Sequence, residues 1–191
     1  MEEIKNNLPV RLFVTAEEWR QWLVTHNDTD GVWLRFYKKG HGESITHGIA
    51  LDEALCHGWI DSQAARYDDD SFLQKFTPRR KGSIWSKRNI EHVERLIEED
   101  RMTPLGLAEI ENAKADGRWQ QAYDSPSNMQ IPQDFLVELA KHPAAHTFFE
   151  TLNKTNLYSI AWRLQTAKTE ATRQKRMQAI IAMLSDHKKF H

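Results

Sequence analysis

The hydrophobic positions follow two periods, and these divide the chain into two regions. Over residues 31–39 the apolar side chains alternate, with Val32, Leu34 and Phe36 on one side, which is the period of a half-buried strand. From residue 86 onwards the apolar spacing is mostly three and four residues, which is typical of helices. We therefore expect an α+β fold, in which an N-terminal antiparallel sheet with packed helices precedes an all-helical C-terminal region.

Capping residues mark where the first helices begin and end. Thr15 and Glu18 have the spacing of a capping box, which predicts a helix from about residue 16. A second helix is expected to end at Gly58, because glycine is favoured just beyond a helix C-terminus. Thr103 and Pro104 predict the start of a later helix that ends near residue 117.

A β-hairpin is expected directly after Gly58. The segments 59–67 and 71–77 have strand character and flank three consecutive aspartates, which suits a hairpin with an acidic turn. In a regular strand, alternate residues share one face. That face would carry Trp59, Asp61, Gln63, Ala65 and Tyr67.

The domain boundaries follow from these elements. Residues 1–120 are expected to form an α+β domain that carries the motifs GWID and TPRRKGSIWS, and residues 121–131 look like a connector. Residues 132–191 are expected to form a helical C-terminal region of several short helices, the last of which begins near Thr169. The helix that begins near residue 86 is expected to have one buried stripe, made by Ile90, Val93, Leu96 and Ile97.

Composition narrows the classes of protein. The chain has 191 residues, 40% of them hydrophobic, and its 26 basic and 27 acidic residues leave a net charge of -1. This balance counts against a general polyanion-binding protein, so an anion site would have to be local. One cysteine, an acidic N-terminus unlike a secretory signal and the absence of a long apolar stretch predict a cytoplasmic protein without membrane insertion.

The most suggestive chemistry lies in residues 77–89, where five cations, two serines and a tryptophan separate a strand from a helix. If Ser86 is the N-cap, the helix N-terminus and the neighbouring arginines would favour an anion. The structural alternative is that Arg80 or Arg88 pairs with the acidic turn at residues 68–70. The predicted ligand-binding set is Trp59, Asp61, Arg79, Arg80, Ser83, Trp85, Ser86 and Asn89.

Catalytic groups are sparse. Asp61 is a weak candidate for a general acid or base, although a carboxylate near arginines is more often part of an ion pair. Cys56 and His57 are adjacent, but neighbouring helical side chains point about 100° apart and do not face each other. Cys56 would need another histidine, such as His47, to become a nucleophile, so we expect it to be a small buried residue.

Neither a metal nor a cofactor is expected. His142 and His146 have helical spacing, but Pro143 disfavours helical geometry at His142, so the two imidazoles should not share a helix face. The sequence also has no second cysteine for a zinc site and no phosphate-binding glycine motif.

Several segments resemble the YdeI/OmpD-associated (OmdA, bacteriocin-protection) family. They are EALCHGWIDS, FTPRRKGSIWSKRNIEHVERL, GLAEIENAKADGRW and, in the helical region, PQDFLVELAKHPAAHTFFETL. The resemblance runs from about Gly31 to Lys188 and implies a role in resistance to bacteriocins, antimicrobial peptides or stress, with no assigned catalytic residues. His57 departs from the aromatic residue expected after Cys56.

Three functional hypotheses remain. The first is a binding protein for a small anionic ligand or a protein partner, and the lack of a complete catalytic motif favours it over an enzyme. The second is an enzyme on a small anionic substrate, with Asp61 as acid or base and the arginines and Ser83 holding the anion. The third is single-stranded nucleic-acid binding through Arg79–Arg88 with Trp85 stacking on a base, which the near-neutral charge counts against.

Overall fold

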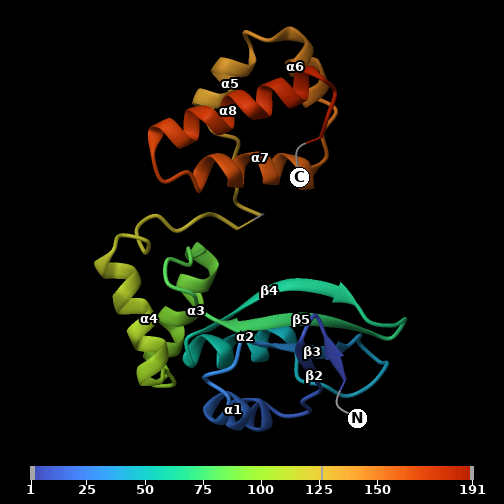
Figure 1. Ribbon diagram of the computed structural model, residues 1–191, viewed down its shortest axis with the longest axis vertical. Coiled ribbons are helices and arrows are strands. Elements are labelled where there is room, and N and C mark those ends of the chain that lie inside the picture. Colours follow the sequence, from blue (N-terminus) through green and yellow to red (C-terminus); the bar gives the residue numbers. More distant parts are fainter. Residues whose placement is uncertain (1–2, 126, 190–191) are drawn as a thin grey trace. The chain divides into compact units, whose positions relative to one another are not determined.

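The computed structural model describes residues 3–125 and 127–189, so residues 1, 2, 126, 190 and 191 of the predicted ranges lie outside it (Figure 1). The chain forms two compact units. One comprises the chain up to Trp85 together with Asn89–Gln120, and the other comprises Ser86–Arg88 and the chain from Gln121 onwards. The first contains a sheet and helices and the second is helical, which confirms the α+β class.

The sheet has five strands in the order β1-β2-β3-β5-β4. Their bounds are Ile4–Lys5 (β1), Leu8–Arg11 (β2), Val32–Tyr37 (β3), Trp59–Arg66 (β4) and Ser71–Pro78 (β5). Three of the four neighbouring pairs are antiparallel, but β2 and β3 are parallel. The expected antiparallel sheet is therefore wrong at this pair, because the helix α1 (Ala16–Thr25) connects the two strands and returns the chain in the same direction.

The predicted helix ends are confirmed in the first unit. Thr15 and Glu18 form the capping box of α1, and α2 (His47–Cys56) is followed by Gly58, whose φ is +75°. The oxygen of Thr103 caps α4 (Pro104–Ala115) by accepting from the Gly106 amide. Helix α3 spans Lys87–Glu98.

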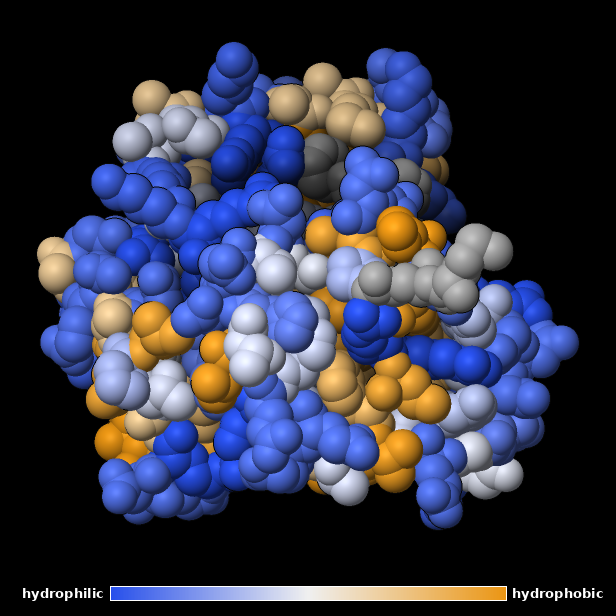
Figure 2. All heavy atoms as spheres, turned by 60° about the horizontal axis from the view of Figure 1, so that its bottom comes forward, coloured by the Kyte–Doolittle hydropathy of each residue, from blue (hydrophilic) through white to orange (hydrophobic). Residues whose placement is uncertain are grey.

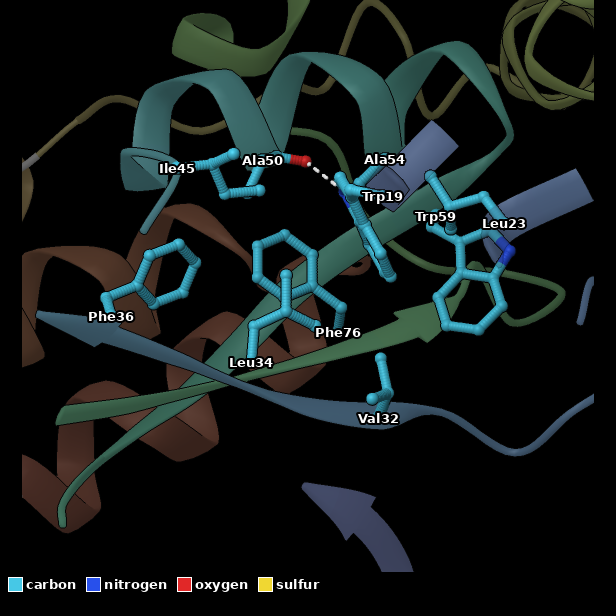
Figure 3. Close-up of a cluster of buried hydrophobic side chains, with 10 residues drawn as sticks. All are labelled: Trp19, Leu23, Val32, Leu34, Phe36, Ile45, Ala50, Ala54, Trp59 and Phe76. Atoms are coloured by element: carbon cyan, nitrogen blue, oxygen red, sulfur yellow. Dashed lines mark hydrogen bonds between the residues drawn. The ribbon is translucent and has the colours of Figure 1, made fainter. Parts of the chain in front are cut away.

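The main core lies on one face of the sheet, beneath α1 and α2. Val32, Leu34 and Phe36 of β3 point into it, as their alternation predicts. The indole of Trp19 on α1 donates a 3.0 Å hydrogen bond to the Ala50 carbonyl of α2, which joins the two helices inside the core (Figure 3). The opposite face of the sheet carries a smaller cluster of Leu8, Val10, Trp33 and Leu73.

The predicted common face of β4 is wrong, because a bulge interrupts the strand. Asp61 pairs with Phe76 and Ala64 pairs with Gln74, so three steps along β4 match two along β5. One extra residue reverses which face each following side chain takes. Trp59 accordingly packs in the main core, whereas Ala65 and Tyr67 pack against the opposite cluster.

The apolar stripe of α3 is narrower than the spacing predicts. Val93 and Leu96 are fully buried, but Ile97 is 43% exposed. Leu96 and Ile97 are neighbours in sequence and therefore point about 100° apart on the helix, so they cannot both face a narrow contact.

The second unit contains α5 (Gln133–Leu139), α6 (Pro143–Phe149), α7 (Lys154–Gln165) and α8 (Glu170–Ser185). Thr169 caps α8, as predicted. The second unit has a hydrophobic core made by residues of all four helices, among them Phe135, Ala145, Ile160 and Ile180.

No helix in the described part of the chain is long and apolar enough to cross a membrane. On the face drawn in Figure 2, hydrophobic residues form separate orange patches between hydrophilic residues in blue. The large apolar side chains with the highest exposure are Ile4, Val24 and Val137, which come from different elements.

Candidate functional site

The basic segment after β5 is anchored by an arginine–tryptophan stack. The Arg79 amide donates to the Gly58 carbonyl at 2.9 Å, and the Arg79 guanidinium carbon lies 3.6 Å from the centroid of the Trp85 ring. Trp85 also contacts Trp119, with ring centroids 5.1 Å apart. Because Arg79 is 8% exposed and Trp85 is 2% exposed, this stack holds the segment from inside the first unit.

The other predicted ligand residues are only partly brought together. Ser83 follows Arg80 in a turn, and its carbonyl accepts from Arg118 at 2.7 Å. Trp59 and Arg79 both line a small cavity of about 150 Å³. Asn89 lies partly buried on α3, and Ser86, directly before α3, belongs to the second unit. Ligand binding by these residues stays a prediction.

A larger groove opens beside the same arginines. Its cavity has a volume of about 470 Å³, and its walls come from the β1–β2 turn, the segment before β3, the end of β5 and the two residues that follow β5. We call it the basic groove. It is lined by Asn6, Asn7, Leu8, Thr29, Asp30, Lys75, Thr77, Pro78, Arg79 and Arg80.

Backbone conformation shapes two walls of the basic groove. Asn6 and Asn7 have φ of 50° and 62°, as a two-residue hairpin turn of type I′ requires, and asparagine tolerates this region well. Gly31 has φ of 137°, and a Cβ there would lie 2.6 Å from the Phe76 carbonyl oxygen. Glycine thus allows the start of β3 to approach β5 closely.

The charges along the groove favour an anion. In the described part of the chain, its lining contains three cations, Lys75, Arg79 and Arg80, and one carboxylate, that of Asp30. Among the described residues, neither Lys75 nor Arg80 has an ion-pair partner. Guanidinium and ammonium groups beside amides and hydroxyls form the usual donor set for phosphate or carboxylate.

The alternative that Arg80 or Arg88 pairs with the acidic turn is wrong. Asp68 pairs with Arg35 at 2.7 Å, Asp69 with Arg66, and Asp70 with His41 at 2.7 Å. The three aspartates therefore contact residues of their own hairpin, of β3 and of the loop that follows β3, and they do not pair with the basic segment.

Asp61 lies apart from the arginines. Its carboxylate is 2.9 Å from Nε2 of His47, the first residue of α2, and the side chains are 24% and 32% exposed. Neither the basic groove nor the small cavity at Trp59 is lined by Asp61. The pair could hold or pass a proton, which keeps Asp61 a candidate for acid–base chemistry.

Cys56 is a buried thiol. Burial, followed by the charge of Glu53, raises its pKa to about 11, so the thiol is protonated at neutral pH. His57 turns its Nδ1 toward the Glu53 carbonyl at 2.9 Å. His47 lies nine residues earlier on the same helix, which places it roughly 13 Å away along the axis. No described histidine therefore activates Cys56 from α2.

His142 and His146 are not arranged as a pair of metal ligands on one helix. His142 has φ of -122° and ψ of 81°, which confirms that the residue before Pro143 is not helical. Within residues 3–125 and 127–189 there is no group of three or more histidine, cysteine, aspartate or glutamate side chains that could hold a metal ion.

Comparison with known families gives two matches. Residues 11–109, just over half of the chain, match the model described as Domain of unknown function (DUF8412). The chain belongs to the DUF8412 family. The DUF8412 match runs from the end of β2 into α4 and includes Lys75, Arg79 and Arg80 of the basic groove. No curated protein and no solved structure matches the chain significantly.

Residues 128–187 match a second model, described as Bacteriocin-protection, YdeI or OmpD-Associated. This match confirms the resemblance to that family and lies over helices α5 to α8. The GWID and TPRRKGSIWS motifs lie within the DUF8412 match instead.

Sequence reasoning missed most of the groove. Asn6 and Asn7 carried a usable signal, since two asparagines between short apolar segments are typical of a tight hairpin. Lys75, Thr29 and Asp30 carried none, because they meet the arginines only through the pairing of β2, β3 and β5.

Proposed function

We propose that this chain is a non-enzymatic binding protein whose basic groove holds a small anionic ligand. The observation that carries the proposal is that Lys75 and Arg80 line a cavity of about 470 Å³ without a carboxylate partner among the described residues. Cavities of this size accept metabolite-sized ligands. A bound anion would supply the charge that the protein does not.

The arrangement suits capture better than chemistry. Arg80 can donate two parallel hydrogen bonds to one phosphate or carboxylate, and Lys75 adds a compact charge. Arg79 also contributes to the lining, but its guanidinium is buried over Trp85, so Lys75 and Arg80 are the cations that would meet a ligand. The side-chain amides of Asn6 and Asn7, in the β1–β2 turn, add neutral donors to the lining.

A thermal-shift screen of purified protein against phosphate, pyrophosphate and di- and tricarboxylates tests the proposal. We expect a concentration-dependent rise in the unfolding midpoint that Arg80→Ala and Lys75→Ala each reduce strongly. Lys81→Ala is the matched control, since Lys81 is an exposed neighbouring cation outside the groove lining. Equal shifts in all three variants would show that the groove is not the site.

We extend the proposal to physiology through the description of the second family, bacteriocin protection. A cytoplasmic anion-binding role in resistance to bacteriocins or antimicrobial peptides fits that description and the sequence. A deletion strain should become sensitive to cationic peptides, and the wild-type gene should restore resistance. Restoration by the Arg80→Ala gene as well would separate resistance from the groove.

The contact between His47 and Asp61 favours one second candidate, acid–base chemistry on a small anionic substrate. In this role Asp61 would hold the imidazole in place while the imidazole exchanges a proton with substrate. Asp61→Asn should then abolish turnover of a substrate found by screening while anion binding persists. Loss of neither activity nor binding would leave the pair a structural link between α2 and β4.

A further inference from the structure

A second cavity adjoins the basic groove. It has a volume of about 350 Å³ and shares Asn7, Leu8, Thr29 and Asp30 with the basic groove. Because these residues line both cavities, the two form neighbouring compartments along one surface of the first unit. A ligand longer than a phosphate could extend from one compartment into the other.

The second cavity has an aromatic wall that the first lacks, and one cation, Arg11, also lines it. Trp22 and His26 line it, and their rings stack with centroids 4.3 Å apart and planes 7° apart. Trp19 continues the stack beneath Trp22, at 5.3 Å and 20°. His26 Nδ1 lies 3.0 Å from the Trp22 carbonyl oxygen, which fixes the imidazole in this orientation. The cavity thus has a rigid aromatic wall.

The shared wall is mostly polar and carries Asp30, the one carboxylate among the described residues that line the basic groove. Asp30 makes no ion pair or hydrogen bond with another described residue. A carboxylate repels phosphate but accepts hydrogen bonds from hydroxyl groups. The first compartment therefore offers the cations Lys75 and Arg80, the shared wall a hydroxyl acceptor with an amide, and the second compartment stacked aromatic rings with Arg11.

We infer that the ligand is a nucleotide, an inference that rests on the proposed anion-binding function. Lys75 and Arg80 hold the phosphates, Asp30 and Asn7 contact the sugar hydroxyls, and the base packs against the wall of Trp22 and His26. An inorganic anion or a simple organic acid would use the first compartment and leave the second without a role. A nucleotide uses both compartments, with its phosphates in the first and its base in the second.

Isothermal titration of the full-length protein distinguishes these ligands. The probes are AMP, ADP, ATP, GTP and UTP, with ribose 5-phosphate and pyrophosphate as probes that lack the base. We expect at least one nucleotide to bind about tenfold more tightly than ribose 5-phosphate, the range that stacking of one base on an aromatic side chain provides. Thermal unfolding of each variant checks that it is folded.

The variants divide the site into its parts. His26→Ala should weaken nucleotide binding about tenfold and leave pyrophosphate binding unchanged, whereas Arg80→Ala should weaken both. Asp30→Asn should weaken binding of nucleotides and ribose 5-phosphate, and Asp28→Asn, an exposed neighbour outside both cavities, is its control.

The possible failures are distinguishable. If pyrophosphate binds as tightly as every nucleotide and His26→Ala changes nothing, the nucleotide inference is overturned and the anion groove stands. If no anion binds, both fail. If only oligonucleotides bind, with an affinity that drops steeply with salt, the ligand is a nucleic-acid strand and the mononucleotide inference is overturned.

Discussion

At the scale of single residues, Glu53 is the centre of a network of charges inside the first unit. Its carboxylate, 3% exposed, accepts two hydrogen bonds from Arg20 at 2.9 and 3.0 Å and one from Arg101 at 2.7 Å. Burial raises the pKa of Glu53, but the hydrogen bonds and charges of the two arginines outweigh burial and leave this pKa below its ordinary value. The ionised carboxylate is therefore the form that the fold stabilises.

Removing this charge should destabilise the protein in a pH-dependent way. Glu53→Gln should lower the free energy of unfolding by about 3 kcal/mol at pH 7, because it leaves the arginines without their partner. A lowered pKa contributes stability above the ordinary glutamate pKa of about 4.3, and this contribution is lost as the pH falls through the lower value of the folded state. Urea unfolding between pH 7 and pH 3 measures the difference.

The matched control is Glu111→Gln. Glu111 is 72% exposed and pairs with Lys114 at 3.2 Å on the surface of α4, so its loss should change the free energy of unfolding by less than about 1 kcal/mol. A Glu53 variant as stable as this control would contradict the assigned role of the network.

The thiol of Cys56 gives a second prediction at this scale. Burial raises its pKa to about 11, and the side chain is 1% exposed, so both thiolate formation and access are suppressed. Ellman's reagent at pH 8 should not react with the native protein and should titrate one thiol in urea. Rapid reaction of the native protein would point to opening of α2 or to an activated cysteine.

At the scale of elements, the approach of α4 to α2 depends on a residue without a side chain. A Cβ on Gly106 would lie 2.3 Å from the Cys56 carbonyl oxygen, which already accepts from the Thr103 amide at 3.1 Å and its hydroxyl at 2.7 Å. Gly106→Ala should therefore force the helices apart and cost about 2 kcal/mol, the usual range for overpacking. Denaturant unfolding gives the value.

Gly48 provides the contrasting substitution. It also lies in the first turn of a helix, but a Cβ there would come no closer than 4.0 Å to a neighbouring atom. Gly48→Ala should stabilise the protein by about 0.5–1 kcal/mol, because alanine loses less backbone freedom in a helix. Similar effects of the two substitutions would show that helix propensity, rather than the contact with α2, governs Gly106.

The elements of the fold differ in how well the sequence predicts them. The capped helices and the hairpin were predictable because a cap or an alternating run is local, as at Thr15 and Gly58. The parallel pairing of β2 and β3 and the bulge after Asp61 were not, because each depends on strands distant in sequence. Because the bulge was not foreseen, Trp59 and Tyr67 were expected on the same side of the sheet, whereas they pack on opposite sides.

In the candidate site, too, the local features were predictable and the long-range ones were not. Arg79 and Arg80 were predictable because a dense cationic run is visible in the sequence. Their different environments were not, since the turn buries one against Trp85 and leaves the other exposed. Asn7 and Asp30 join them only in the folded sheet: the asparagine pair indicates a tight turn, but no local pattern places that turn or Asp30 beside the arginines.

At the scale of the whole molecule, the near-neutral net charge conceals two regions of opposite sign. Up to Asn128 the chain has 17 basic and 22 acidic residues, a net charge of -5. From Met129 onwards it has 9 basic and 5 acidic residues, a net charge of +4, and the two values sum to the -1 of the full chain. The near-neutral balance therefore counts against polyanion binding by the chain as a whole, but it does not count against polyanion binding by the helical region.

This division predicts how the chain behaves when it is cut. Helices α5 to α8 share a core of their own, so we expect the piece from Met129 onwards to stay helical after cleavage at a protease site inserted behind Asn128. At pH 7 that piece should bind a cation exchanger and the N-terminal piece an anion exchanger, because their net charges have opposite signs.

At low salt the pieces should attract each other, and in about 1 M salt, where the Debye length is roughly 3 Å, they should separate on gel filtration. Pieces that stay together at that salt concentration would be held by contacts that salt does not screen, such as the packing of Tyr123 against Trp162 within the second unit, and the separation predicted from charge would then be wrong.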